Sequence, residues 1–135
     1  MEKKRRITVS SGKAKGRRLQ NLVCEEFIKK HPKLREGDIR PALMGESGTD
    51  IKMSPLAKDE IIFDIECKNQ EKLNIWSALN QAEENTEENR ISLLVFRRNH
   101  SKNYAVIEFD KLMELLYKSD SINKLEDKKD LDEKL

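Results

Sequence analysis

Apolar positions change their spacing along the chain, and each spacing predicts a different element. From about residue 15 to residue 30 they recur every three or four positions, which predicts an amphipathic helix that ends at His31 and Pro32. Ser10, Ser11 and Gly12 predict a break before this helix. Between residues 33 and 54, glycines and prolines interrupt the pattern, so we expect only short strands, around residues 39–44 and 49–53.

The clearest strand covers residues 61–68, where apolar and polar side chains alternate. Later spacing predicts a helix at about residues 73–88, a buried strand at 91–96, a strand at 104–109 in hairpin with it, and a last helix with Asp110 as its N-cap. The order is helix, three strands, helix, two strands, helix. It predicts an α/β fold with a central mixed β-sheet flanked by helices.

Composition narrows the class of protein. The chain has 135 residues, of which 36% are hydrophobic and 39% are charged, so we expect one domain with a small core and an ionic surface. The longest apolar runs are far shorter than the roughly 20 residues of a membrane span, and no apolar segment follows the basic start as in a secretory signal. We therefore expect a cytoplasmic protein. Cys24 and Cys67 form no CxxC pair and are expected to be buried thiols.

The net charge is only +2, but the charge is unevenly distributed. We expect residues 1–12 to form a flexible basic arm, residues 13–117 the folded domain, and residues 118–135 a charged tail that is a frayed helix or disordered. The basic side chains of the first 18 residues are Lys3, Lys4, Arg5, Arg6, Lys13, Lys15, Arg17 and Arg18. A second basic group at the predicted hairpin tip consists of Arg97, Arg98, His100 and Lys102. Both groups can contact phosphates or can serve solubility alone.

Candidate chemistry lies at the end of the clearest strand. Glu66 and Lys68 are two residues apart, so their side chains project from the same face about 6.6 Å apart at the base. Pairing across the sheet can bring Asp50 to the same side. Two carboxylates held together repel unless a cation joins them, and hard oxygen ligands suit Mg²⁺ or Mn²⁺. The amine of Lys68 can then orient water or stabilise charge on a phosphate.

The structural alternative is an exposed edge strand that carries Asp64, Glu66 and Lys68 as a solvated charge ladder. Spacing alone favours this alternative, because Glu-x-Lys on an exposed strand face is common. The remaining acidic residues nearby are expected to be surface charges: Glu46, Asp59, Glu60 and Asp64.

These residues belong to a longer pattern. It consists of Gly48-Thr49-Asp50-Ile51, then Phe63-Asp64-Ile65-Glu66-Cys67-Lys68-Asn69, then a helix bearing Gln81. Over roughly residues 13–116 the chain resembles the PD-(D/E)XK nuclease superfamily, and within it the archaeal Holliday-junction resolvases and their phage-encoded relatives. The resemblance implies a restriction-endonuclease-like core and a magnesium-dependent endodeoxyribonuclease, in which Mn²⁺ can substitute.

The resemblance also implies roles for individual residues. Asp50, Glu66 and the main-chain carbonyl of Cys67 would bind the metal. Lys68 would be the catalytic lysine, and Gln81 would point at the site from the following helix.

The chain departs from the family pattern at two positions. Thr49 stands where these nucleases often have proline. Gln20 stands where resolvases carry a first-helix glutamate, so we expect Gln20 at the site and favour a single metal. Glu25 or Glu26 can replace the missing carboxylate only if the helix register differs.

The family also implies a substrate and an assembly. We expect branched DNA, such as a four-way junction met in recombination and repair, in a bacterial, archaeal or phage-infected cell. A homodimer would present one active site to each of two equivalent strands. Two alternatives stay open. The first is a restriction-type or homing-type nuclease, against which the sequence shows no separate recognition domain. The second is an inert DNA-binding protein of the same fold, which the missing glutamate supports.

The expected DNA contacts are Lys13, Lys15, Arg17, Arg18, Ser47, Arg97, Arg98 and Lys102. Ser47 is included because it lies in the glycine-flanked loop before Asp50, although such residues serve any tight turn. Trp76 is expected in the core or in the dimer interface.

Overall fold

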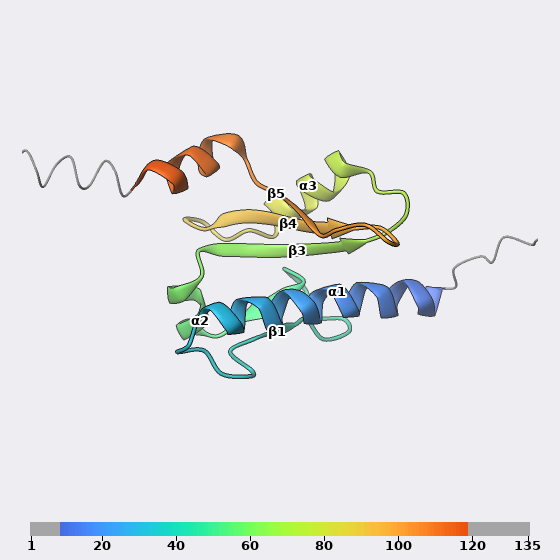
Figure 1. Ribbon diagram of the computed structural model, residues 1–135, viewed down its shortest axis with the longest axis horizontal. Helices are drawn as coiled ribbons and strands as arrows, with labels where there is room; N and C mark the ends of the chain where they lie inside the picture. The colour runs from blue at the N-terminus through green and yellow to red at the C-terminus, as the bar shows by residue number, and fades with distance from the viewer. Residues whose placement is uncertain (1–8, 119–135) are drawn as a thin grey trace, which may run out of the picture.

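The computed structural model describes residues 9–118, whose helices and strands are drawn in Figure 1. They are α1 (Val9–Lys30), β1 (Ile39–Pro41), β2 (Ile51–Met53), α2 (Pro55–Glu60), β3 (Phe63–Asn69), α3 (Ile75–Glu84), β4 (Ile91–Arg97) and β5 (Tyr104–Val106). A further helix covers residues 109–118. Most of the predicted basic arm, with Lys3, Lys4, Arg5 and Arg6, and nearly all of the predicted tail lie outside the described residues.

Strands β3, β4 and β5 form one mixed sheet. β3 runs parallel to β4, with Glu66 opposite Leu94. β4 runs antiparallel to β5, with Val95 opposite Ala105. A parallel pair needs a crossover connection, and α3 lies on it. The predictions of a mixed sheet and of the hairpin after β4 are confirmed, and the chain has an α/β fold, but the mixed sheet contains only these three strands, because β1 and β2 form a separate sheet.

Helices cover the sheet on both faces, with α1 on one side and α3 on the other (Figure 1). The core joins Leu19 and Val23 of α1 to Ile65 and Cys67 of β3. Because side chains alternate along a strand, the odd-numbered residues of β3 face α1 and the even-numbered ones face the opposite side. Cys24 and Cys67 are both buried and free, as predicted.

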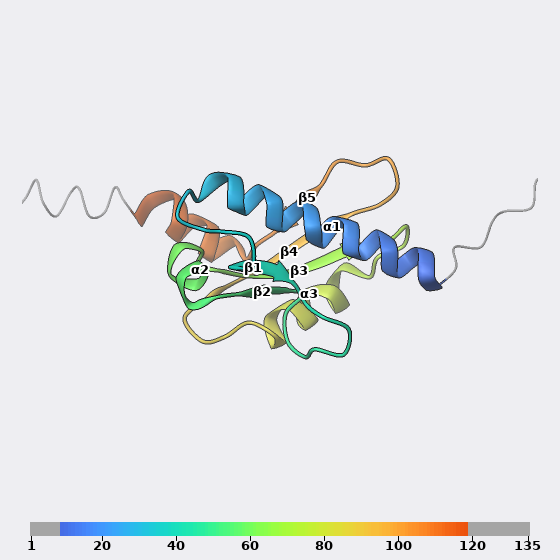
Figure 2. The same cartoon turned by 90° about the horizontal axis from the view of Figure 1, so that it is seen from below.

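The hairpin of β1 and β2 stands beside the sheet, as the view from below shows (Figure 2). The two strands are antiparallel, with Ile39 opposite Met53, and β2 contacts β3. Both predicted strands are confirmed but are only three residues long. The hairpin brings the loop before β2 to the edge of β3 that β4 leaves free.

Helix α1 begins at Val9, so the predicted break at Ser10, Ser11 and Gly12 is wrong. Among residues 9–118, nothing beyond the helix's own backbone and the adjoining residues lies within 4 Å of where a side chain at Gly12 would begin, so no tertiary packing interrupts the helix there. A glycine or serine costs a helix only about 0.5–1 kcal/mol. That cost is too small to stop a helix that continues into the strongly helix-forming segment after Gly12.

Helix α2 is an element that the hydrophobic pattern did not predict. Its N-cap is Ser54, whose side chain accepts a hydrogen bond from the main-chain nitrogen of Ala57, and Pro55 stands in its first turn. Serine followed by proline is a typical helix start. The signal was therefore present, but a helix of six residues is too short for helical periodicity to reveal.

The last predicted elements are shifted by a few residues. β5 ends at Val106, and the following helix begins at residue 109, so Asp110 lies in its first turn and the predicted N-cap is wrong. An acidic residue is favourable in either position, because both lie near the positive end of the helix dipole. Within residues 9–118, no helix has the length and apolar character to cross a membrane.

Candidate active site

The ionic face of β3 is buried. Asp64 is 7% exposed and Glu66 is 1% exposed, and Lys68 is half-buried. The alternative of a solvated charge ladder is therefore wrong. A buried carboxylate needs hydrogen bonds, an ion pair or a metal, and the two carboxylates of β3 differ in how they meet this need.

Asp64 is fully satisfied by protein groups. Its Oδ1 accepts a hydrogen bond from Nε of Arg90 at 2.8 Å, and its Oδ2 accepts one from the main-chain nitrogen of Glu87 at 2.8 Å. The same guanidinium donates to the main-chain oxygens of Ile61 and Phe63. The expectation that Asp64 is a surface charge is wrong, because Arg90 compensates its burial. This pair is structural.

Asp50 stands at the free edge of β3. It follows a loop in which Gly45 and Gly48 have φ angles of 79° and 93°, a left-handed conformation that favours glycine. Its Oδ2 accepts a hydrogen bond from the main-chain nitrogen of Cys67 at 2.9 Å. The loop and the hairpin thus hold the Asp50 carboxylate against the middle of β3, next to Glu66.

Glu66 has only one hydrogen-bond donor for its two oxygens. Nδ2 of Asn85 donates to Oε1 at 3.0 Å, whereas Oε2 is buried and has no partner among the described residues. Burial, followed by the close approach and the charge of the Asp50 carboxyl group, raises the pKa of Glu66 from 4.5 to about 8, while Asn85 and Lys68 act in the opposite direction. A cation between the two carboxyl groups would remove the cause of this repulsion.

The oxygen atoms at this edge fit a hard divalent cation. The amide nitrogen of Cys67 points toward Asp50, and because the N–H and C=O of one strand residue point to the same edge, its carbonyl is directed there too. Two carboxylates and a carbonyl suit Mg²⁺ or Mn²⁺, which complete their coordination with water. Across residues 9–118 no three His, Cys, Asp or Glu side chains are grouped as metal ligands, so the carbonyl would be the third protein ligand.

Lys68 lies on the same strand face as Glu66. The two residues are two positions apart on the strand, so their side chains project side by side, and the charge of Lys68 lowers the pKa of Glu66. In the described part of the chain, that amine forms no hydrogen bond or ion pair. An uncommitted, half-buried ammonium beside two carboxylates is available to a reacting phosphate or water.

Asn85 is the site residue that sequence reasoning missed. Gln81, which was expected to point at the site, is exposed on α3 and forms no side-chain hydrogen bond within residues 9–118. Asn85 lies one turn later, at the C-cap of α3, and bonds Glu66. Asparagine is common at helix ends, but that signal says nothing about which side chain the amide will contact.

The first helix adds no carboxylate to the site. Gln20 is half-buried beside Leu19 and makes no hydrogen bond among the described residues. Glu25 and Glu26 are exposed, and Glu26 pairs with Lys29 at 3.2 Å. Among the described residues, neither glutamate interacts with Asp50 or Glu66.

A hollow of about 300 Å³ opens beside the site. Its lining includes Thr49, which precedes Asp50 in the chain, Asn85, which bonds Glu66, and the cation Lys52. Its other cations are compensated, because Arg40 pairs with Glu46 and Lys58 pairs with Glu87, both at 2.9 Å.

The expected DNA contacts fall into two groups. One group lines a separate hollow and consists of Lys15, Arg18 and Arg97. The other is exposed outside that hollow and consists of Lys13, Arg17, Ser47, Arg98 and Lys102.

Comparison of the chain with models of protein families, with curated proteins and with solved structures finds no match.

Proposed function

We propose that this chain is a metal-dependent endodeoxyribonuclease with a restriction-endonuclease-like core, acting on branched DNA such as four-way junctions in the cytoplasm. One observation carries the proposal: Glu66 is buried beside Asp50 with an oxygen that has no partner in the described residues. On the same strand, Asp64 is fully satisfied by Arg90 and a main-chain amide. A carboxylate left incomplete in the same surroundings is expected of a ligand site rather than of a structural pair.

Asp50, Glu66 and the Cys67 carbonyl would hold one Mg²⁺, or Mn²⁺ in its place, which would neutralise charge on a phosphodiester and polarise it. Asn85 engages Oε1 of Glu66 and leaves Oε2 for the cation. The ammonium of Lys68 can hold the attacking water or donate to a phosphate oxygen. The water gives up one proton as its oxygen bonds to phosphorus, the bond from phosphorus to the leaving sugar oxygen breaks, and that oxygen takes up a proton, so one water is consumed for each bond cut. The products are a phosphate end and a hydroxyl end.

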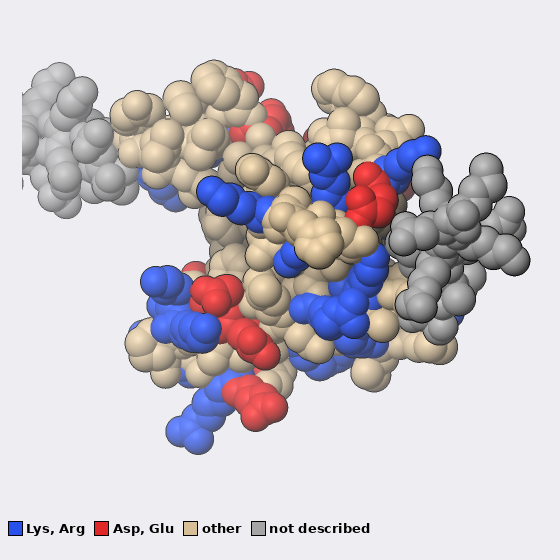
Figure 3. Space-filling view, turned by 45° about the vertical axis from the view of Figure 1, so that its right-hand side comes forward, with Lys and Arg blue, Asp and Glu red and all other residues tan. Residues whose placement is uncertain are grey.

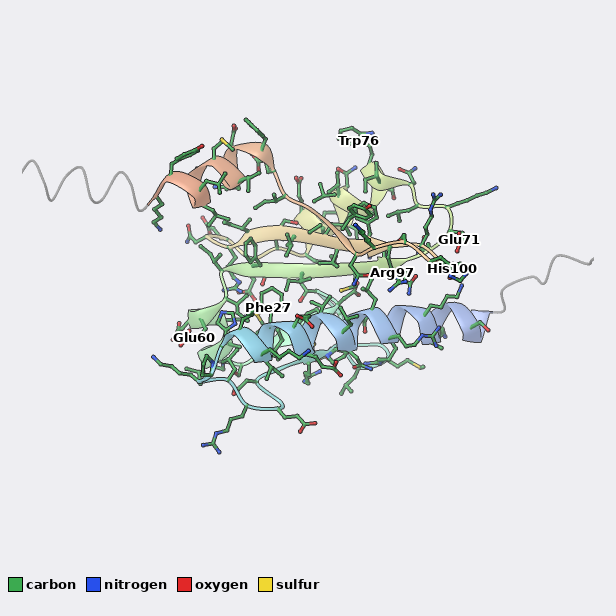
Figure 4. All side chains as sticks on the ribbon, in the orientation of Figure 1. Phe27, Glu60, Glu71, Trp76, Arg97 and His100 are labelled. Atoms are coloured by element: carbon green, nitrogen blue, oxygen red, sulfur yellow. The ribbon has the colours of Figure 1, made fainter. Side chains whose placement is uncertain are left out.

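The proposed assembly is a homodimer, which would cut two equivalent strands of a junction. Trp76 on α3 is 75% exposed and points away from the sheet (Figure 4), which excludes a core position. Phe109 is 69% exposed. The helix that contains it lines the same hollow as Leu79 of α3 and Val106 of β5. Exposed aromatic side chains of this kind are enriched in protein interfaces. Sedimentation should give a dimer for the wild type and a shift toward monomer for Trp76→Ala.

Cleavage of labelled four-way junctions, flaps and linear duplexes with Mg²⁺, Mn²⁺ or EDTA tests the function. The proposal predicts cutting of junctions with either metal and none in EDTA. Cutting of linear duplex at one defined sequence would favour the restriction-type alternative. Junction binding without cutting under every condition would identify an inert DNA-binding protein.

A further inference from the structure

A basic hollow of about 390 Å³ lies between α1 and the carboxyl ends of β3 and β4. It joins two groups of residues that are far apart in the sequence. Lys15 and Arg18 come from α1, Arg97 ends β4, and His100 lies in the following turn. Figure 4 shows Arg97 and His100 near the N-terminal half of α1.

The positive charge of this hollow is not compensated by ion pairs. Within residues 9–118, Lys15, Arg18 and Arg97 form no ion pair with a carboxylate. Lys15 donates to Oδ1 of Asn99 at 2.7 Å and Arg97 to Oδ1 of Asn103 at 3.3 Å, and these neutral amides leave the charge in place. The hollow beside the active site differs, because two of its three cations are paired with carboxylates.

In Figure 3, Lys and Arg side chains mix with acidic ones at the lower left, whereas toward the centre and right fewer acidic side chains lie among them. The carboxylate of Glu71 is near this hollow, where it accepts a hydrogen bond from the main-chain nitrogen of Asn99 at 2.8 Å. It therefore holds the turn in place instead of pairing with a cation of the hollow.

The hollow is also held in shape before any ligand arrives. Nδ2 of Asn69 donates to the main-chain oxygen of Lys15 at 3.0 Å and ties α1 to the end of β3. The turn is closed by the main-chain nitrogen of Arg98, which donates to the hydroxyl of Ser101 at 3.0 Å. His100 has a φ of 62°, a conformation that residues other than glycine adopt mainly where surrounding contacts fix it. Preorganised cations lose little freedom on binding an anion.

We propose that this hollow is a phosphate-binding site that holds one phosphodiester of the DNA strand cut at Asp50 and Glu66. A guanidinium presents paired donors that match phosphate oxygens, and the hollow offers two of them beside an ammonium. Asn69 lies three residues after Glu66 on β3, about 10 Å along the strand. Successive phosphates of one DNA strand lie only a few ångströms apart along the helix axis, so a few nucleotides suffice to reach from the cut bond to the bound phosphate. Only the identity of the ligand as DNA rests on the proposed function.

Binding can be tested without metal or cleavage. The full chain, labelled with ¹⁵N and kept in EDTA, is titrated with inorganic phosphate and, separately, with a short DNA duplex. The proposal predicts that both ligands shift the amide signals of Lys15, Asn69 and Asn99. Shifts with phosphate but not with DNA would mean a site for free phosphate and would overturn the assignment to a DNA strand. No shift at these residues with either ligand would overturn the site.

Two charge-matched double variants locate the contact. Arg18→Gln with Arg97→Gln removes two cations of the hollow, whereas Lys30→Gln with Arg35→Gln removes two exposed cations at and beyond the other end of α1, so the net charge is the same. The first should weaken duplex binding at least about tenfold and, because one phosphate contact is lost, reduce the slope of log affinity against log salt by about 0.9. The second should stay close to wild type. Equal weakening by both would mean a diffuse basic surface and would contradict the proposal.

Both experiments measure binding rather than cleavage, so their results do not depend on the metal site. Loss of cleavage in Asp50 variants with the phosphate response intact would support both proposals. A wild-type chain that never cuts DNA but still binds it through this hollow would refute the nuclease and leave the phosphate site standing.

Discussion

Replacement of Glu66 by glutamine should stabilise the metal-free protein at alkaline pH while it removes the response to Mg²⁺. The two side chains have the same shape, and the amide oxygen can still accept the hydrogen bond from Asn85. The amide nitrogen would stand where Oε2 is buried without a partner, and it can donate toward Asp50. The substitution therefore removes a poorly compensated buried charge and supplies a missing donor.

The size of the effect follows from the pKa of Glu66, which is about 8 in the folded chain against an ordinary 4.5. Between these values the folded state holds a proton that the unfolded state releases, so the stability of the metal-free wild type falls as the pH rises. At about 1.4 kcal/mol per tenfold change in proton affinity, full ionisation costs at most roughly 5 kcal/mol. Water near the site reduces this to about 2–3 kcal/mol. Below pH 4.5 both the folded and the unfolded state hold the proton, so this pH-dependent loss of stability disappears.

Urea unfolding in EDTA at pH 5 and pH 9 measures this difference. Glu66→Gln should gain about 2–3 kcal/mol over wild type between the two pH values, and added Mg²⁺ should stabilise only the wild type. Glu88→Gln, which changes an exposed glutamate, should follow the wild type at both pH values. The reasoning is refuted if the advantage of Glu66→Gln is the same at both pH values or reverses at pH 9.

Three further substitutions separate catalysis, positioning and structure. Lys68→Ala should slow cleavage by about two orders of magnitude or more with an unchanged Mg²⁺ titration, and equal loss of both would mean that Lys68 only holds the carboxylates. Asn85→Ala should weaken Mg²⁺ binding by about tenfold or more in calorimetry, because Glu66 loses its orienting donor, and an unchanged affinity would contradict that role. Arg90→Met should lower the free energy of unfolding in urea by about 3–5 kcal/mol, because it leaves the carboxylate of Asp64 buried without its ion-pair partner. A loss under about 1 kcal/mol would show that the pair is not structural.

The sequence predicted best those features that depend on neighbours along one element. A strand repeats every two residues, so the common face of Glu66 and Lys68 follows from spacing once the strand is recognised. The core face of α1 follows in the same way from Leu19 and Val23, and both residues are buried. The start of α1 was missed because glycine and serine change helix stability by too little to fix a boundary.

Contacts between distant elements could not be read from the pattern. The burial of Asp64 depends on Arg90, which lies 26 residues later. The contact of Asn85 with Glu66 depends on where α3 ends and on how it crosses the sheet. Local spacing carries no information about such pairings, since they are fixed by the packing of whole elements.

The central claim is that Asp50 and Glu66 form the metal site of a nuclease, and single-turnover cleavage of a four-way junction tests it most directly. Wild type, Asp50→Asn and Asp59→Asn are compared in Mg²⁺ and in EDTA, with Asp59, an exposed carboxylate in α2, as the control. We predict metal-dependent cutting by the wild type and by Asp59→Asn, and none by Asp50→Asn although it still binds the junction. Cutting by Asp50→Asn at the wild-type rate, or cutting by the wild type in EDTA, would contradict the account.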